Sequence, residues 1–369
     1  MYRRSFIKNV LSASALAALP HGSRLLAETP PKRLLILGGT YFLGPALVEG
    51  AIAGGHTVTL FNRGVTNPDL FPHIETIHGF RSPNPEDENL DALGRRHWDA
   101  VIDVWPHDPA LVELAARRLK DRTDHYLYVS SISAYDKSRP DVSAIHEEAP
   151  LATWDGHASF YSRGKAESER RLHSIIGQKL TIVRPGGIKG VRDDTPDMLI
   201  WLRRMQTMKS VIAPGKGLFQ VAVVDVKDVA DFLLMAITGS IYGTFNLFGQ
   251  PMPFHNFLAG LRSAVHSDSE LVWIPEKFLH EQGVYPQFIS PWLSNFPYCR
   301  PDNGPLDSAP QAIISNQKAF DAGWQTRALR DTAYDCLESF GSRSGFQFKD
   351  TLSKQKQEEI LRNWRSQSK

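Results

Sequence analysis

The sequence RLLILGGTYFLG at residues 33–44 decides the fold. Its first part, Arg33–Leu37, is almost wholly apolar, which is typical of a strand buried on both faces of a parallel sheet. A glycine-rich turn follows, then a helical pattern over Pro45–Ala53 and a second strand pattern at His56–Phe61. This strand–turn–helix–strand unit of about 30 residues predicts a nucleotide-binding α/β sheet.

Further strand patterns alternate with helical patterns up to residue 250. Strands are expected at Ile74–His78, Ala100–Val104, His125–Val129, Leu180–Val183 and Thr244–Leu247, and helices include Ala110–Leu119 and Gly164–Ile176. The alternation predicts the α/β class, with a doubly wound parallel sheet of the Rossmann type over residues 33–250.

The pattern changes after Gln250, where Trp, Pro, Phe and His become frequent and strand signals become sparse. We therefore expect residues 251–345 to form a smaller C-terminal substrate or cap lobe. Parts of residues 190–220 are expected to contribute to the same lobe. Residues 350–369 have the pattern of a charged C-terminal helix.

The first 27 residues are expected to be a twin-arginine export signal and not part of the fold. Arg3 and Arg4 precede Phe6-Ile7-Lys8, an apolar stretch runs from Val10 to Leu19, and Ala27 offers a cleavage site. An ordinary basic N-terminal helix is the alternative. The export signal predicts a periplasmic or extracellular protein that meets the twin-arginine translocon in transit.

Composition excludes several classes of protein. With 369 residues, 42% of them hydrophobic, the chain is neither disordered nor collagen-like. No apolar run reaches the ~18–20 residues of a membrane span. The formal net charge is +2; the predicted signal carries four positive charges and no negative ones, so the remainder carries −2. A weakly acidic chain is a poor electrostatic partner for nucleic acid, and we expect no such partner.

The histidines and cysteines do not predict a metal centre. None of the 13 histidines forms a His-x-x-x-His pair, and the two cysteines form no Cys-x-x-Cys pair, so we expect no bound metal. A single bridge between Cys299 and Cys336 stays open, because the sequence does not decide it.

The glycine turn predicts a dinucleotide site. Small residues such as Gly38 and Gly44 let the main chain approach a pyrophosphate, whose charge the following helix N-terminus stabilises. Tyr41 stands where a third glycine is usual. After the second strand come Asn62 and Arg63, with no acid for a ribose 2′-hydroxyl. Asn62 can donate a hydrogen bond and Arg63 can pair with a 2′-phosphate, which favours NADP over NAD.

Three polar residues predict the chemistry. Ser131 follows the strand at His125–Val129, and Tyr161 and Lys165 lie four positions apart, hence on one face of a helix. We expect the Lys165 ammonium to lower the pKa of Tyr161 toward working pH. Ser131 would then bind the substrate oxygen while Tyr161 moves its proton. A surface Tyr–Lys pair without a catalytic role is the alternative.

These motifs resemble the extended short-chain dehydrogenase/reductase superfamily, in its NAD-dependent epimerase/dehydratase branch. The resemblance covers most of residues 33–250 and rests on the turn, the Ser131 strand end, the Tyr161/Lys165 pair and the segments 183–188, 224–229 and 243–246. The form Gly-Gly-Thr-x-Phe-Leu-Gly is similar to an atypical subgroup that includes chloroplast stem-loop RNA-binding proteins and bacterial epimerase-like relatives.

The resemblance implies a role for each site residue. Ser131, Tyr161 and Lys165 would form the catalytic triad, with Lys165 also holding the nicotinamide ribose. The cofactor-binding set would be Gly38, Thr40, Tyr41, Phe42, Leu43, Gly44, Asn62, Arg63, Asp103, Lys165, Pro185 and Ile188. Tyr41 and Trp105 depart from the usual residues of the family.

The predicted export narrows the expected function. An exported enzyme meets no large dinucleotide pool, so a net dehydrogenase would stop after one turnover. An epimerase or dehydratase returns the hydride within one cycle, so we expect an enzyme that retains NADP or NAD and acts on a secondary alcohol of a sugar or glycoside. The alternatives are an NADP-dependent reductase of a small carbonyl compound, indicated by Arg63, and a non-catalytic or RNA-binding relative, indicated by Tyr41 and Trp105. A homodimer also stays open.

Overall fold

A computed structural model describes residues 30–82, 84, 89–104, 108–136, 144–156, 158–195, 197–285, 313–341 and 352–367. The predicted export signal at residues 1–27 lies outside these ranges, and so do Trp105 and Cys299. Lys32–Lys369 is one compact unit.

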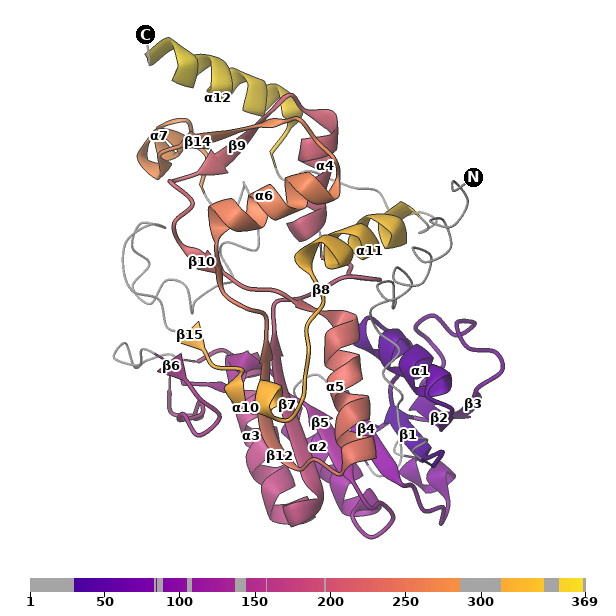
Figure 1. Cartoon of the computed structure of the whole chain (residues 1–369). Coiled ribbons are helices and arrows are strands. Elements are labelled where there is room, and N and C mark those ends of the chain that lie inside the picture. The colour runs from indigo at the N-terminus through magenta and orange to yellow at the C-terminus, as the bar shows by residue number, and fades with distance from the viewer. Residues whose placement is uncertain are drawn as a thin grey trace, which may run out of the picture. The chain divides into compact units, whose positions relative to one another are not determined.

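Seven strands build the central sheet (Figure 1). They are β1 (Arg33–Leu37), β2 (Thr57–Asn62), β3 (Glu75–His78), β4 (Ala100–Asp103), β5 (Tyr126–Val129), β7 (Leu180–Gly186) and β12 (Gly243–Phe248). Their order is β12-β7-β5-β4-β1-β2-β3, and every neighbouring pair is parallel. The chain winds outward from β1 in both directions, so the topology switches between β1 and β4, where such sheets bind ligands. The predicted doubly wound parallel sheet is confirmed.

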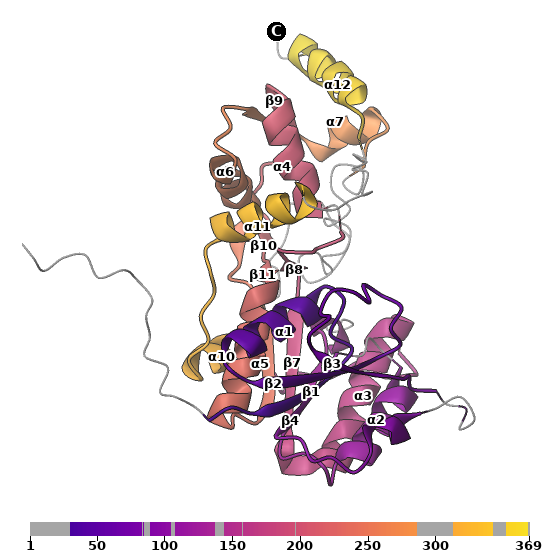
Figure 2. The ribbon, with the colours of Figure 1, turned by 90° about the vertical axis from the view of Figure 1, so that its right-hand side faces the viewer.

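Helices cover both faces of the sheet (Figure 2). Helices α1 (Leu43–Ala53) and α5 (Val226–Gly239) pack on one face, and α2 (Pro109–Leu119) and α3 (Phe160–Ile176) on the other. Strand β1 shows why its sequence is apolar throughout. Leu34 and Ile36 join the core under α1 and α5, while Leu35 and Leu37 join the core under α2 and α3.

Helix α3 begins earlier than its sequence pattern predicts. We expected a helix from Gly164, but the helix begins at Phe160 because Ser159 caps it, its Oγ accepting a hydrogen bond from the Ser162 N–H at 3.2 Å. Tyr161 therefore lies in the first turn of α3, and Lys165 lies one turn further along.

A second group of elements lies beyond the carboxyl ends of the sheet strands (Figure 1). It contains α4 (Asp197–Thr207), β9 (Ser210–Pro214), α6 (Phe254–Ala264), β14 (Glu270–Ile274), α7 (Glu276–Glu281), α11 (Leu329–Gly341) and α12 (Lys354–Gln367). Trp201, Phe254 and Phe257 are fully buried in its core. Strand β14, which pairs in parallel with β9, has no counterpart among the strands expected from the sequence. We call this group the substrate lobe.

Shorter elements lie in the connections between these strands and helices. They are η1 (Leu90–Leu93), η2 (Ile132–Ala134), β6 (Ala144–Ile145), η3 (Gly177–Lys179), β8 (Ile188–Lys189), β10 (Gln220–Val221), β11 (Val224–Asp225), β13 (Met252–Pro253), β15 (Ile313–Ile314) and α10 (Gln317–Asp321). Arg327, just before α11, donates from Nε to the Asp228 carboxylate of α5 at 2.6 Å. This ion pair ties the chain that enters the substrate lobe to the sheet.

Two features are absent from the described ranges. No helix there combines the length and the apolar character that crossing a membrane requires. No group of three or more His, Cys, Asp or Glu side chains there is placed to hold a metal ion.

Candidate active site

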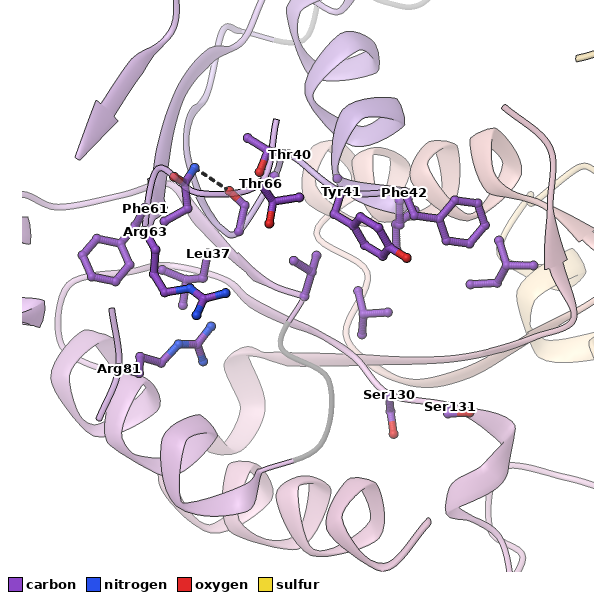
Figure 3. Close-up of a pocket in the computed structure, with 18 of the residues that line it drawn as sticks. Leu37, Thr40, Tyr41, Phe42, Phe61, Arg63, Thr66, Arg81, Ser130 and Ser131 are labelled. Carbon is purple, nitrogen blue, oxygen red and sulfur yellow. Dashed lines mark hydrogen bonds between the residues drawn. The ribbon is translucent and has the colours of Figure 1, made fainter. Parts of the chain in front are cut away.

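A cavity of about 540 Å³ lies at the switch point of the sheet (Figure 3). Its volume falls within the roughly 300–1,000 Å³ of small-molecule and cofactor sites. The predicted residues that line it are Gly38, Thr40, Tyr41, Phe42, Leu43, Gly44, Asn62, Arg63, Ser131, Tyr161, Lys165, Pro185 and Ile188. The fold thus brings the glycine turn, the Ser131 strand end and the Tyr161/Lys165 pair together around one space.

The glycine turn has the close backbone approach that a dinucleotide requires. Gly38 has φ +115°, and a Cβ there would lie 2.6 Å from Val104 Cγ2. A Cβ on Gly44 would lie 2.5 Å from the Gly39 carbonyl carbon, so only glycine lets α1 start this close to the turn. No side chain of the described residues caps the N-terminus of α1. The Gly44 N–H donates to the Tyr41 carbonyl at 2.9 Å, and Pro45 has no N–H. The positive end of the helix dipole still lies at the turn and suits a pyrophosphate, so the turn fits the predicted cofactor.

Tyr41 lies at the rim of the cavity, on its glycine-turn side. Its hydroxyl donates a hydrogen bond to the Asp194 carboxylate, in the loop between β8 and α4, and the residue is 56% exposed. The aromatic side chain that replaces the third glycine therefore extends across the cavity rim and does not fill the turn.

Asn62 has a structural task at the end of β2. Its Nδ2 donates to the Gly38 carbonyl at 3.2 Å, and its Oδ1 accepts from the Gly64 N–H at 2.8 Å. Both ends of the amide are used to hold the glycine turn against the next loop. A contact between Asn62 and a ribose stays a prediction.

Two arginines face the cavity at the ends of β2 and β3. Figure 3 shows Arg63 and Arg81 at one end of the site and Ser130 and Ser131 at the other. Arg81 is buried, and its two terminal nitrogens donate to both oxygens of Asp103 at 2.8 Å. Asp103 was predicted to bind the cofactor, but it does not line the cavity. Arg81, which is paired with Asp103, lines the cavity instead. Arg63 is exposed and has no hydrogen bond or ion pair within the part of the chain described here.

Ser131, Tyr161 and Lys165 meet at the opposite end of the cavity. The Tyr161 and Ser131 hydroxyls share a hydrogen bond, and Ser131 Oγ also accepts from the Ser133 N–H at 3.1 Å. Lys165 is 2% exposed, and its Nζ donates to the Val129 carbonyl at 2.6 Å. The ammonium lies 5.9 Å from the centre of the Tyr161 ring. This arrangement suits proton transfer at a substrate oxygen.

The expected effect of Lys165 on the pKa of Tyr161 is wrong for this structure. Burial raises the pKa of the Tyr161 phenol above its usual value, and the hydrogen bond with Ser131 offsets this only in part. Burial also lowers the pKa of Lys165 to about 7, against the pull of Asp103 and Glu169, which raise it. Lys165 is thus a weakened cation whose Nζ donates to the Val129 carbonyl, and in this structure it does not lower the pKa of Tyr161 as the spacing alone suggested.

A buried polar network beneath the site was not predicted from the sequence. Ser130 donates a hydrogen bond from Oγ to the Glu169 carboxylate, and Arg184 donates to the same carboxylate at 2.6 Å. Arg184 also donates to the Tyr135 hydroxyl at 2.8 Å. Glu169 lies four residues after Lys165 on α3, so helical spacing was the available signal. The network fixes the strand end that carries Ser131.

Some residues weighed from the sequence are not placed. Trp105, which departs from the usual residue of the family, lies outside the described residues. Cys336 is buried in α11. Its pairing with Cys299 stays open, because Cys299 also lies outside those ranges.

A family comparison agrees with this site. Residues 108–247 match the model of the NAD dependent epimerase/dehydratase family. This segment contains Ser131, Tyr161 and Lys165. The match covers less than half of the chain, and over that segment it agrees with the predicted resemblance.

Curated relatives have different activities in their names. The chain is 28% identical over 228 residues to the Arabidopsis thaliana chloroplast stem-loop binding protein of 41 kDa b, which covers 58% of this chain. The chain spans only 57% of the length of that relative. It is 25% identical over 282 residues to human sterol-4-alpha-carboxylate 3-dehydrogenase, decarboxylating, covering 67% of this chain and 70% of the human protein.

Solved structures share the fold. A UDP-glucose 4-epimerase from Thermotoga maritima, determined with UDP-glucose, has a TM-score of 0.60 at 18% identity and covers 84% of this chain and 98% of its own. The Bordetella bronchiseptica enzyme WbmG, in complex with NAD and UDP, has a TM-score of 0.61 at 15% identity and covers 85% and 96%. At these identities the likeness concerns the fold alone.

Lys165 predicts a pH dependence of stability. Its pKa of about 7 in the folded protein lies below the ordinary 10.5, so between these values the unfolded chain binds a proton that the folded chain lacks. The contribution of Lys165 to the free energy of unfolding therefore rises with pH through this window and is least favourable below about pH 7. The Lys165→Met variant removes this rise. Urea unfolding of both proteins at about pH 6 and about pH 10 measures it.

We expect the wild-type chain to gain stability relative to Lys165→Met when the pH is raised, by on the order of a few kcal/mol. If the difference between the two proteins stays constant with pH, the lowered pKa of Lys165 is contradicted.

Proposed function

We propose that the protein is an NAD(P)-dependent enzyme of the epimerase/dehydratase type that acts by transient hydride transfer at a secondary alcohol of a sugar or glycoside. One observation carries the proposal: Ser131, Tyr161 and Lys165 converge on a single cavity whose other wall is the uncapped N-terminus of α1 behind a glycine turn. The turn suits a dinucleotide phosphate, and the three polar side chains suit an alcohol or carbonyl oxygen.

Each side chain has a task in this proposal. A bound nicotinamide supplies the uptake and return of a hydride. Ser131 holds the substrate oxygen in line with Tyr161, with which it already shares a hydrogen bond. Tyr161 takes the hydroxyl proton when the alcohol is oxidised and gives it back when the carbonyl is reduced. Because burial raises the pKa of Tyr161, a cation near the phenol in the loaded site would favour proton removal. Lys165 is the nearby group that can supply that charge.

The substrate class follows from the proposed export. Nucleotide sugars are made in the cytoplasm, so an exported enzyme would act on a free sugar, a glycoside or a cell-wall sugar. Such an enzyme would carry its dinucleotide out within the folded chain and regenerate it in each cycle. The structurally similar UDP-glucose 4-epimerase was determined with a nucleotide sugar. The proposal for this chain therefore differs from that protein in substrate while keeping the chemistry at the ring hydroxyl.

Tyr161→Phe tests the catalytic assignment. Loss of the phenol hydroxyl removes the proton donor and acceptor, so we expect turnover of the sugar to fall by about 10²–10⁴-fold. Dinucleotide binding, measured by fluorescence titration, should stay near the wild-type value because the ring remains. Trp154→Phe, an exposed aromatic change outside the cavity lining, is the control. A Tyr161→Phe protein with full turnover would overturn the assignment.

A second candidate is an NADP-dependent reductase of a small carbonyl compound, which Arg63 and the sterol dehydrogenase relatives favour. It would consume one NADPH for each product formed. A cofactor-retaining enzyme would form many products with no net change in NADPH absorbance. The Arabidopsis thaliana stem-loop binding relative suggests a third candidate, a stem-loop binder. Its binding would survive Tyr161→Phe, whereas sugar turnover would not.

We propose NADP as the preferred cofactor. No acid follows β2, Arg63 is exposed on the cavity wall, and Arg81 is held beside the same end by Asp103. A 2′-phosphate at that end would meet a guanidinium, whereas a ribose 2′-hydroxyl would meet no carboxylate acceptor of the kind that NAD-selective sites use.

Arg63→Gln tests this preference. We expect the Kd for NADPH to rise about tenfold, the effect of losing roughly 1.4 kcal/mol of charge-assisted bonding, while the Kd for NADH changes little. Arg95→Gln, which removes an exposed arginine that does not line the cavity, is the matched control. Equal losses for NADPH and NADH would show that Arg63 does not read the 2′-phosphate.

Export stays a proposal that rests on Arg3, Arg4 and the apolar stretch after them. The double change Arg3→Lys with Arg4→Lys keeps the charge but removes the arginine pair. In a bacterial host with a twin-arginine system, we expect cell fractionation to find the wild-type chain outside the cytoplasm and the variant inside. Export of both proteins alike would reject this route.

A further inference from the structure

The loop between β8 and α4, residues 190–195, contacts the glycine-turn side of the cavity at two places. The Tyr41 hydroxyl donates to the Asp194 carboxylate. Two residues earlier in the loop, Arg192 pairs with Glu49 of α1 at 2.8 Å. The loop thus connects two walls of the site that belong to distant parts of the sequence.

The same loop is firmly held on its own side. Lys189 is buried and places Nζ 3.3 Å from Asp193 and 3.1 Å from Asp197. The Arg192 N–H donates to Ser339 Oγ of α11 at 2.7 Å. Buried, charge-assisted contacts of this kind fix the loop against the substrate lobe. The contacts to Tyr41 and Glu49 are therefore the ones that can open without disturbing that lobe.

The Tyr41 contact lies at the rim of the cavity. Gly38–Gly44 form one wall, and Pro185–Ile188 form another. The chain that leaves the second wall at Ile188 becomes, two residues later, the loop that carries Asp194. Figure 3 shows the Tyr41 side chain extending from the glycine turn along the cavity. A glycine in place of Tyr41 would have no side chain to span this gap.

We propose that Tyr41 and Asp194 form a clasp that closes the phosphate side of the cavity over a bound dinucleotide and slows its release. The inference rests on the proposed function, since it needs a dinucleotide in the cavity. It assigns a task to the residue by which this glycine turn departs from the usual pattern. A cofactor that must survive many turnovers is retained when the path past the turn is closed by a hydrogen bond that has to break first.

Release rates test the clasp. The purified full chain is loaded with NADPH, and loss of its fluorescence on mixing with excess NADP⁺ gives the dissociation rate. Tyr41→Phe removes only the hydroxyl, and Asp194→Asn removes the charge of its partner. We expect each variant to release NADPH about three- to tenfold faster than the wild-type chain, as for the loss of one charge-assisted hydrogen bond. The double variant should be no faster than the faster single variant, because both remove the same contact.

Glu49→Gln is the matched control. It breaks the second contact between the same loop and α1, but Glu49 does not line the cavity and its ion pair is partly exposed. We expect release from Glu49→Gln at close to the wild-type rate. If Glu49→Gln accelerates release as much as Tyr41→Phe, general separation of the two walls controls release and the clasp is rejected.

The outcomes separate the clasp from the proposed function. A wild-type chain that binds neither NADPH nor NADH removes the basis of both. A chain that binds NADPH, turns over the sugar and loses activity in Tyr161→Phe supports the function. If in that same chain Tyr41→Phe and Asp194→Asn release NADPH at the wild-type rate, the clasp alone is overturned. Faster release with additive effects in the double variant also overturns it, because the two groups then act separately.

Discussion

The close approach of α1 to the turn after β1 is the constraint on which the site depends. A side chain on Gly44 would overlap the Gly39 carbonyl carbon at 2.5 Å, so the helix can begin here only on glycine. That contact places the N-terminus of α1 at the turn after β1, where the order of the sheet switches between β1 and β4. It also leaves Tyr41 in the turn with its side chain outward. The phosphate cradle and the rim of the cavity are consequences of this one contact.

The opposite end of the site depends on buried charge. Lys165 has little access to water, and the acids Glu169 and Asp103 near it are each already bound by an arginine. A buried carboxylate without a partner would destabilise the fold, and Arg184 and Arg81 supply those partners for Glu169 and Asp103. Lys165 is left directed at the Val129 carbonyl, beside Tyr161. The pairing explains how one lysine stays close to two carboxylates without forming a simple ion pair with either.

Much of the sheet could be predicted from the sequence because parallel strands buried on both faces are continuous apolar runs. Arg33–Leu37 is predicted with its observed bounds, and the other sheet strands shift by a few residues. Strand β14 was missed because its sequence, ELVWI, is only partly buried and follows a region with few strand signals. The start of α3 was missed because the Ser159 cap, not the apolar pattern, sets it.

The sequence could predict which residues form the candidate site, but not their pKa values. The four-residue spacing along a helix places Tyr161 near Lys165. The carboxyl ends of parallel strands lie at one edge of the sheet, which brings Ser131 and the glycine turn to the same site. Both inferences need only local geometry. The direction of the Tyr161 pKa depends on how deeply the phenol is enclosed and on where the Lys165 ammonium points, which are tertiary properties. Arg81 was missed because it follows a short strand and belongs to no motif.

The edges of the sheet have a consequence for self-association. One edge is β3, only four residues long and carrying Glu75 at its start. At the other edge, α10 approaches β12, with Lys318 Nζ 4.9 Å from the centre of the Phe245 ring. The short polar edge strand β3 and the β12 edge, which α10 covers, both disfavour strand addition by a neighbouring chain. The central sheet therefore offers little free edge for fibrillar stacking.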